Sequence, residues 1–523
     1  MQRRTFLQIA GYSTVYGSLL ADLAHSAAAL EPAEIAGTDA DLHLLRRISF
    51  GPTAATLVRV RGIGRSAYID EQLATTDAFS DLTAKTLYPL INTKGASIYL
   101  STLSGLAINV HQLHLQSAML YRALFSKAQL YELMVDFWND HFNTYLRKNP
   151  IPLKIDLDRD VIRVHALGNF KTLLKATVRS GEMLHYLDNW LNRSGQINEN
   201  YARELLELHS LGKDGGYSEA DMKALARILS GLGIVVDLPL AALAYGKVQF
   251  TAAQHDKSAK TFLGQSFPAG GGQAEIDRAL NLIADHPGTA RFIALKLCRR
   301  FVADNPPQAL VTRVASAFTQ SNGDIKTMLR VILNSTEFAS SAGSKLKRPQ
   351  EAMIGAMRAC GVTLVEQIAN VSLSGIPIAA PNGLLFNSLV QAGHEPFAWV
   401  PPNGYPDLES YWANTNTALY QQKFLVKLVE GINLSYVLSN PLGVLNGISF
   451  ATSVTRATTP RQAVRSAITN LLFTPLPAAA EAACVDFVAQ YDSPDAAMVA
   501  GTLEQRVKGL VFVLLASPWF LRR

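Results

Sequence analysis

Three polar residues, Asn200, Glu204 and Glu207, are spaced so that a helix would place them on one face. Arg203 precedes Glu207 by four positions and can pair with it. Two carboxylates on one face can act as general acid and base, or bind a divalent cation. The same spacing is also typical of a solvated helix face with an arginine–glutamate ladder, so the residues permit both interpretations.

A second polar face lies earlier in the chain, where Asp136, Asp140 and Asn143 follow the same spacing. If the helix that carries Glu204 packs against it, Asp136, Asp140 and Glu204 form a group of oxygen ligands suited to a divalent metal. His141, among aromatic residues, is a candidate catalytic residue. A histidine in such surroundings is also typical of a satisfied core position.

The charge balance of this predicted contact, between residues 200–208 and 134–143, restricts its chemistry. Burying unpaired carboxylates is costly, and Arg203 supplies one positive charge. We therefore expect a metal ion, a protonated histidine or carboxylates facing water. The four carboxylates to be neutralised are Asp136, Asp140, Glu204 and Glu207.

His255 and Asp256 are adjacent in a predicted loop, where they form either an acid–base element or an ordinary turn. A divalent metal is the cofactor that these residue types suggest. The predicted metal ligands are Asp136, Asp140 and Glu204. The predicted catalytic residues are Glu204, Glu207, Arg203, His141, His255 and Asp256.

Several common sites are excluded by missing motifs. The chain has no HExxH or Walker A motif, no GxGxxG after a strand and no GxSxG elbow. Its three cysteines, Cys298, Cys360 and Cys484, are widely separated, which excludes a CxxC pair and argues against a haem or iron–sulfur redox protein.

Helical periodicity dominates the sequence and predicts an all-α protein that is more than half helical. Two short strands are expected, at 248–251 and 371–373. Long loops rich in proline and glycine are expected at 252–272 and 375–407, and the second contains six prolines. The predicted helical segments are 98–143, 276–283, 289–302, 310–318, 325–333, 418–428 and 509–521.

Two segments resemble each other: 331–338 reads VILNSTEF and 513–520 reads VLLASPWF, each after an amphipathic helix. Either a helical unit is duplicated or two helices stop alike. We place a boundary near Gly343, which gives a signal segment at 1–29, an N-terminal helical region with the site at 30–343 and a C-terminal helical region at 344–523.

Composition sets the broad class. The chain has 523 residues, a net charge of +6 and 17% charged residues, so it is neither disordered nor a charge-rich coiled coil. No run of basic residues suggests binding to nucleic acid, and no segment is apolar enough for a stable membrane span. Arg3-Arg4-Thr5-Phe6-Leu7, a weakly apolar stretch and Ser26-Ala27-Ala28-Ala29 predict export by the twin-arginine machinery.

Six segments in order carry a family resemblance: 43–53, 137–143, 166–170, 198–217, 286–290 and 402–406. Over roughly residues 40–523 the chain resembles the bacterial domain-of-unknown-function 1800 family. The resemblance implies an exported, largely helical protein, often encoded beside a sulfatase-like exported protein. It implies no settled activity. The family more often has His-Asn-His where this chain has Asn139-Asp140-His141.

Two functions are compatible with these observations. The first is a periplasmic or secreted hydrolase that acts on envelope or extracellular material through a cluster of carboxylates and histidines. The second is a non-catalytic partner of a sulfatase-like exported protein, which would use the proline-rich loop as its contact surface. Carboxylates and histidines that converge in a cleft would favour the enzyme.

Overall fold

Helices account for about 64% of the computed structural model, which confirms the all-α prediction and the expectation of more than half helix. Arg3 and Arg4 lie outside the described residues. None of the described helices is long and apolar enough to cross a membrane. The structure describes residues 18–24, 26–27, 37, 39–103, 108–149, 153–236, 244–362, 372–373, 376–377, 383–431 and 459–523.

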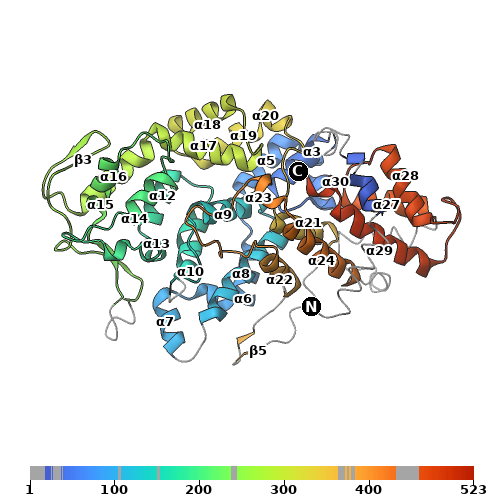
Figure 1. Cartoon of the computed structure of the whole chain (residues 1–523), viewed down its shortest axis with the longest axis horizontal. Coiled ribbons are helices and arrows are strands. Elements are labelled where there is room, and N and C mark those ends of the chain that lie inside the picture. Colours follow the sequence, from blue (N-terminus) through green and yellow to red (C-terminus); the bar gives the residue numbers. More distant parts are fainter. Residues whose placement is uncertain are drawn as a thin grey trace.

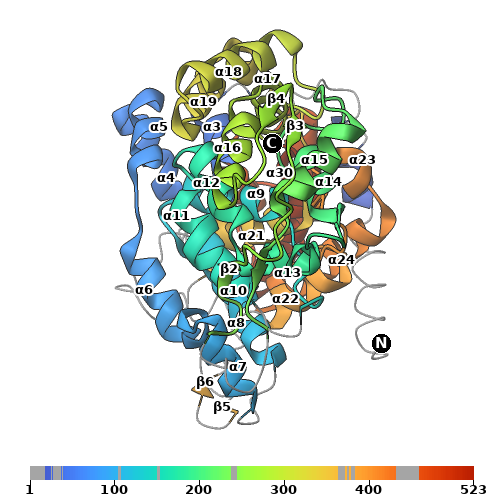
Figure 2. The same ribbon diagram turned by 90° about the vertical axis from the view of Figure 1, so that its left-hand side faces the viewer.

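The helices of the first half begin with a run along one edge of the molecule, where α4 to α6 are drawn in blue (Figure 2). They are α3 (Ala40–Ile48), α4 (Ala54–Ile63), α5 (Arg65–Ala74), α6 (Ala78–Leu87), η1 (Pro89–Asn92), α7 (Gly95–Leu103), α8 (Ile108–Phe125), α9 (Gln129–His141), α10 (Lys154–Asp156), the π-helix η2 (Leu157–Ile162), α11 (Arg163–His165), α12 (Phe170–Val178), α13 (Gly181–Tyr186), η3 (Asn189–Leu191), α14 (Asn200–Glu207) and α15 (Glu219–Leu229).

Among the helices of the second half, α17 to α20 lie along the top of Figure 1 and α27 to α30 lie at its right. They are α16 (Gln273–Asp285), α17 (Pro287–Phe301), α18 (Gln308–Gln320), α19 (Ile325–Leu333), α20 (Thr336–Ala339), α21 (Pro349–Ala359), α22 (Gly383–Gln391), α23 (Glu409–Trp412), α24 (Thr415–Gly431), α27 (Pro460–Leu471), α28 (Ala478–Ala489), α29 (Ala500–Ala516) and α30 (Pro518–Leu521).

The strands form short antiparallel pairs, and both predicted strands are present. The pairs are β1 (Leu232–Ile234) with β2 (Val248–Phe250), β3 (Lys260–Phe262) with β4 (Gln265–Phe267), and β5 (Ser372–Leu373) with β6 (Ile376–Pro377).

Both predicted loop regions contain regular structure that the prediction missed. The β3–β4 hairpin lies within 252–272, and α22 lies within 375–407. The prolines of the second region made the whole of it look irregular, but α22 occupies a stretch without proline between Pro381 and Pro396.

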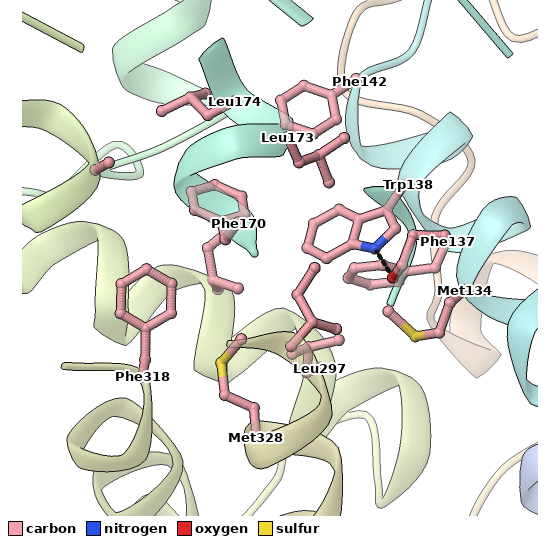
Figure 3. Packing of buried hydrophobic residues seen from close by; sticks show 14 of the residues in the cluster. Met134, Phe137, Trp138, Phe142, Phe170, Leu173, Leu174, Leu297, Phe318 and Met328 are labelled. Atoms are coloured by element: carbon pink, nitrogen blue, oxygen red, sulfur yellow. Dashed lines mark hydrogen bonds between the residues drawn. The ribbon is translucent and has the colours of Figure 1, made fainter. Parts of the chain in front are cut away.

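The main core holds α9 in place. The Trp138 indole is fully buried against Phe170, and Nε1–H donates to the Ala166 carbonyl at 2.9 Å. Leu173 and Leu297 pack beside it from α12 and α17 (Figure 3). Because one side of α9 is anchored in this core, its other side, with Asp136 and Asp140, is directed towards charged partners.

Two helical units of the fold are built alike. In α17–α18–α19 and in α27–α28–α29 each helix packs on the other two. A short helix with serine at its N-cap position follows each unit, with Ser335 before α20 and Ser517 before α30. The similar segments 331–338 and 513–520 end these two units. This arrangement favours a duplicated helical unit over two helices that stop alike.

Adjacent arginines of α3 bind the equivalent helix ends of the two units. Arg46 donates to the carbonyl of Leu472 at 3.0 Å, and Arg47 donates to that of Val302 at 2.9 Å. Both arginines are buried. Arginine near a helix C-terminus satisfies carbonyl groups that have no partner within the helix, so α3 ties the two units together.

Candidate active site

Asp136 and Asp140, one helical turn apart on α9, share one partner. Arg348, which immediately precedes α21, donates from Nη2 to Asp136 Oδ2 at 2.5 Å and from Nη1 to Asp140 Oδ2 at 2.9 Å. The Arg348 side chain is 3% exposed. The two predicted metal ligands therefore lie together, but a guanidinium from more than 200 positions away occupies the place expected for a cation.

Buried arginines extend this network behind the two aspartates. Glu351, in the first turn of α21, lies 2.6 Å from Arg300 Nη1 and 3.0 Å from Arg523 Nη1. Arg300 Nη2 is 3.9 Å from Asp136 Oδ2. The predicted alternatives for neutralising the carboxylates were a metal ion, a protonated histidine or water, and this structure uses arginines from distant segments instead.

A cavity of about 380 Å³ opens beside Asp140. It lies between the end of α9, the last turns of α17, the start of α21 and the loop 403–408. Its wall is rich in cations and aromatic rings, with Phe137, Asp140, His141, Leu208, Phe292, Lys296, Arg299, Arg300, Arg348, Asn403, Gly404, Tyr405, Pro406, Asp407 and Leu408.

The proline-rich loop forms one wall of the cavity and lies directly on the end of α9. Gly404 has a φ of +71°, and a Cβ there would be 2.0 Å from the Asp140 carbonyl oxygen. The side-chain amide of Asn143 anchors the preceding part of the loop by donating to the carbonyls of Trp399 at 2.9 Å and Pro401 at 2.7 Å. Only glycine permits this approach, so the loop has a fixed position against Asp140.

His141 and Lys296 are in contact at the cavity wall. The His141 ring lies 3.0 Å through Nε2 from the His209 carbonyl and 2.9 Å through Nδ1 from Lys296 Nζ. A carbonyl can only accept, so Nε2 carries the proton and Nδ1 accepts from Lys296. Burial and the nearby ammonium of Lys296 hold the pKa of His141 well below its usual range. His141 is therefore neutral and positions Lys296.

Two groups at this cavity have pKa values shifted towards neutrality from opposite directions. Burial lowers the pKa of Lys296 from 10.5 to about 8, and Arg299 adds to this effect. Burial and the neighbouring Asp136 raise the pKa of Asp140 to about 6, although Arg348 opposes the shift. A carboxyl group and an amine that both titrate near neutral pH beside one cavity are typical of an acid–base site.

Glu204 and Glu207 lie elsewhere. Their helix, α14, packs on α15, and Glu204 lines a separate, more open cavity of about 400 Å³. Arg203 is 46% exposed and pairs with Glu199 at 3.9 Å and Glu219 at 3.3 Å. This matches the solvated arginine–glutamate ladder, and the predicted partnership of Arg203 with Glu207 is absent from the described ion pairs.

The predicted metal site does not assemble in the described part of the chain, where no three histidine, cysteine or acidic side chains form a group suited to a metal ion. Asp136 and Asp140 are bound by Arg348, and Glu204 faces a different cavity. Helical spacing correctly places Asp136 and Asp140 on one face of α9, but it does not determine which segment packs on that face. The sequence predicted residues 200–208 there, whereas in the structure Arg348 contacts both aspartates.

His255 and Asp256 form a structural turn. His255 Nδ1 lies 2.9 Å from the Ser230 carbonyl, and Asp256 accepts from Arg227 Nε at 2.9 Å. Although burial opposes it, the hydrogen bonds from Arg227 and Ser258 lower the pKa of Asp256 below its usual range. Neither residue lines the cavity beside Asp140, which agrees with the ordinary-turn interpretation.

The sequence prediction missed most of the basic residues of this site. Lys296, Arg299 and Arg300 follow one another at helical spacing on α17, and Arg348 ends the run Lys345-Leu346-Lys347-Arg348. The run of cations before Pro349 was a usable signal, but the sequence analysis placed only a boundary between regions there, near Gly343.

A family model described as a protein of unknown function (DUF1800) matches residues 43–522. The chain belongs to this family, and the cavity beside Asp140 lies within the matched region. Comparisons with curated proteins and with solved structures gave no match.

Proposed function

We propose that this protein is a hydrolase whose active site is the cavity beside Asp140 and Lys296. The observation that carries the proposal is the pair of opposite pKa shifts at one cavity, to about 6 for Asp140 and about 8 for Lys296. At neutral pH the carboxylate of Asp140 can accept a proton from an attacking water molecule, and the ammonium of Lys296 can donate one to the leaving oxygen.

The charge of the cavity favours a substrate with an anionic group. Lys296, Arg299, Arg300 and Arg348 line it, and the opposing carboxylates are Asp140 and Asp407. Guanidinium groups bind carboxylate and phosphate oxygens through paired hydrogen bonds. An anionic group held by these residues would place a neighbouring ester or similar bond within reach of Asp140 and Lys296.

The proposed setting is the periplasm or the medium, after export by the twin-arginine route. The alternative function is a non-catalytic partner of a sulfatase-like exported protein. Such a protein needs no pair of titrating groups at its cavity, so it should show no activity that depends on them. The pH dependence of any activity therefore separates the two functions.

The test is a panel of chromogenic carboxylate, phosphate and sulfate esters, assayed from pH 5 to pH 9. We expect turnover of at least one anionic ester. Its rate should rise through about pH 6 as Asp140 loses its proton and fall through about pH 8 as Lys296 loses its own.

Glu204→Gln is the matched control, because Glu204 lines the other cavity. The variant should keep the same pH profile and lie within about 0.5 kcal/mol of the wild-type stability. A flat pH profile, or loss of activity in Glu204→Gln, would contradict the proposed site.

A further inference from the structure

A second cavity, of about 430 Å³, shares no lining residue with the proposed active site. It lies between α6, α8, α9 and the π-helix η2. Its wall combines charged and apolar side chains, with Thr76, Asp77, Ala78, Asp81, Lys85, Ile91, Leu115, Arg122, Tyr131, Glu132, Ile155, Asp158, Arg159, Arg163 and Val164.

The π-helix shapes one wall of this cavity. The Arg163 N–H donates to the Asp158 carbonyl, five residues back, and this wider turn brings Asp158 and Arg159 to the wall. Single π-helical turns are rare and often occur at functional sites. In this protein the π-helix η2 supplies two residues, Asp158 and Arg159, to the cavity wall.

The carboxylates of the wall are already satisfied within the protein. Both oxygens of Glu132 accept from Arg163, at 3.2 and 3.0 Å. Asp158 accepts from Arg163 at 3.0 Å and from Asn139 at 2.8 Å. The remaining pairs are Asp77–Ser80, Asp77–Lys127, Asp81–Arg122 and Asp81–Lys85. No carboxylate of this wall is left to attract a cation.

Arg122 is a buried cation of this wall with hydrogen-bond donors that have no partner in the described residues. It is 3% exposed, and its Nη2 donates to Asp81 at 2.7 Å. Within the described residues, Asp81 is its only hydrogen-bond partner, and its buried Nε has none. A guanidinium has five N–H groups, and leaving such donors unpaired in a buried position is costly. The cavity wall therefore offers a donor that an incoming acceptor would satisfy.

We propose that this cavity binds a small monocarboxylate with an apolar body, through the Arg122 guanidinium. The planar fork of an arginine matches a carboxylate geometrically. Ile91, Leu115 and Ile155 provide an apolar lining for the rest of the molecule. A phosphate dianion fits less well, because the wall holds as many carboxylates as cations, and among these cations only Arg122 has a buried nitrogen without a hydrogen-bond partner in the described residues.

The test is calorimetric titration of the purified protein with benzoate and, separately, with inorganic phosphate. We expect benzoate to bind more tightly than phosphate. Arg122→Gln should weaken benzoate binding by about 10-fold or more, because it removes the charged hydrogen-bond donor of the carboxylate.

Val164→Trp provides a second variant if Arg122→Gln does not fold. Val164 lines the cavity and is 64% exposed at its rim, so tryptophan would obstruct the cavity and leave Arg122 intact. This variant should also lose benzoate binding. Arg65→Gln, at a 53% exposed side chain, should bind benzoate like the wild type.

Four results would overturn the proposal. They are absence of benzoate binding to the wild type, tighter binding of phosphate than of benzoate, unchanged benzoate affinity in both cavity variants, and loss of benzoate binding in Lys296→Met with retention in Arg122→Gln. The last result would place the carboxylate in the proposed active site.

Discussion

Glu351→Gln should lower the free energy of unfolding by about 3–5 kcal/mol, the usual cost of removing one partner from a buried ion pair. Glu351 is 2% exposed and lies between Arg300 and Arg523, with Arg348 at 4.0 Å. Despite burial, these arginines hold its pKa well below its usual range. Glutamine has nearly the same shape as glutamate and can still accept from the Arg348 backbone N–H. The loss of stability therefore measures the effect of removing the negative charge.

Urea denaturation of Glu351→Gln and Glu481→Gln measures this effect. Glu481 pairs with the exposed Arg465 at 2.8 Å, and such surface pairs contribute about 0–1 kcal/mol. A loss in Glu351→Gln no larger than that in Glu481→Gln would show that the buried network does not depend on its central carboxylate.

Lys296→Met should strongly reduce activity and raise stability at neutral pH. Loss of the proposed acid should reduce the rate by about 10²–10⁴-fold, the typical contribution of general acid–base catalysis. The folded protein holds the pKa of Lys296 at about 8, below its ordinary 10.5, so keeping this ammonium buried costs stability. After allowance for partial solvent access and the lost contact with His141, we expect a gain of about 1–2 kcal/mol.

The sign of this effect fixes its pH dependence. Between about pH 8 and 10.5 the unfolded chain binds more protons at Lys296 than the folded protein does, so wild-type stability rises with pH there. The advantage of Lys296→Met should be full below about pH 8 and disappear above about pH 10.5. Thermal melts across this range measure it. Lys223→Met, at an exposed position, should show no such trend, and a destabilised Lys296→Met would contradict the account.

Local patterns in the sequence predicted the fold well. Periodic apolar residues marked α16 to α19 and α24. Helix starts also follow local patterns: a capping box between Ser218 and Asp221 begins α15, and Pro287 is the first residue of α17. These features depend on residues a few positions apart, so the sequence contains them directly. The two predicted loop regions were the exceptions, because the β3–β4 hairpin lies in the first and α22 lies between the prolines of the second.

The candidate site was only half predictable. Spacing on α9 brought Asp136 and Asp140 to one face, and the structure confirms that they lie together. Their partner Arg348 is 212 and 208 positions away, respectively, and no local pattern pairs residues at that distance. Charged residues are rarely buried unless paired, so the interpretation favoured solvent or a metal over buried arginines.

If the two similar helical units arose by duplication, their equivalent positions have diverged. With Val302 and Leu472 as equivalent positions, Ser466 and Asn470 of α27 correspond to Lys296 and Arg300 of α17. The second unit thus keeps the helix packing and lacks the cations. Of the two units, the first supplies basic residues to the cavity beside Asp140, and Arg348, which precedes α21, supplies a further one.

The most direct test of the central claim is the pKa of Lys296 in the folded wild-type protein. Competitive acylation of the lysines at a series of pH values, read by mass spectrometry of the peptides, gives this value for each side chain. The account predicts a pKa of about 8 for Lys296, because burial outweighs its attraction to Asp140. A Lys296 that titrates near 10.5, as an ordinary lysine does, would contradict an acid–base pair at this cavity.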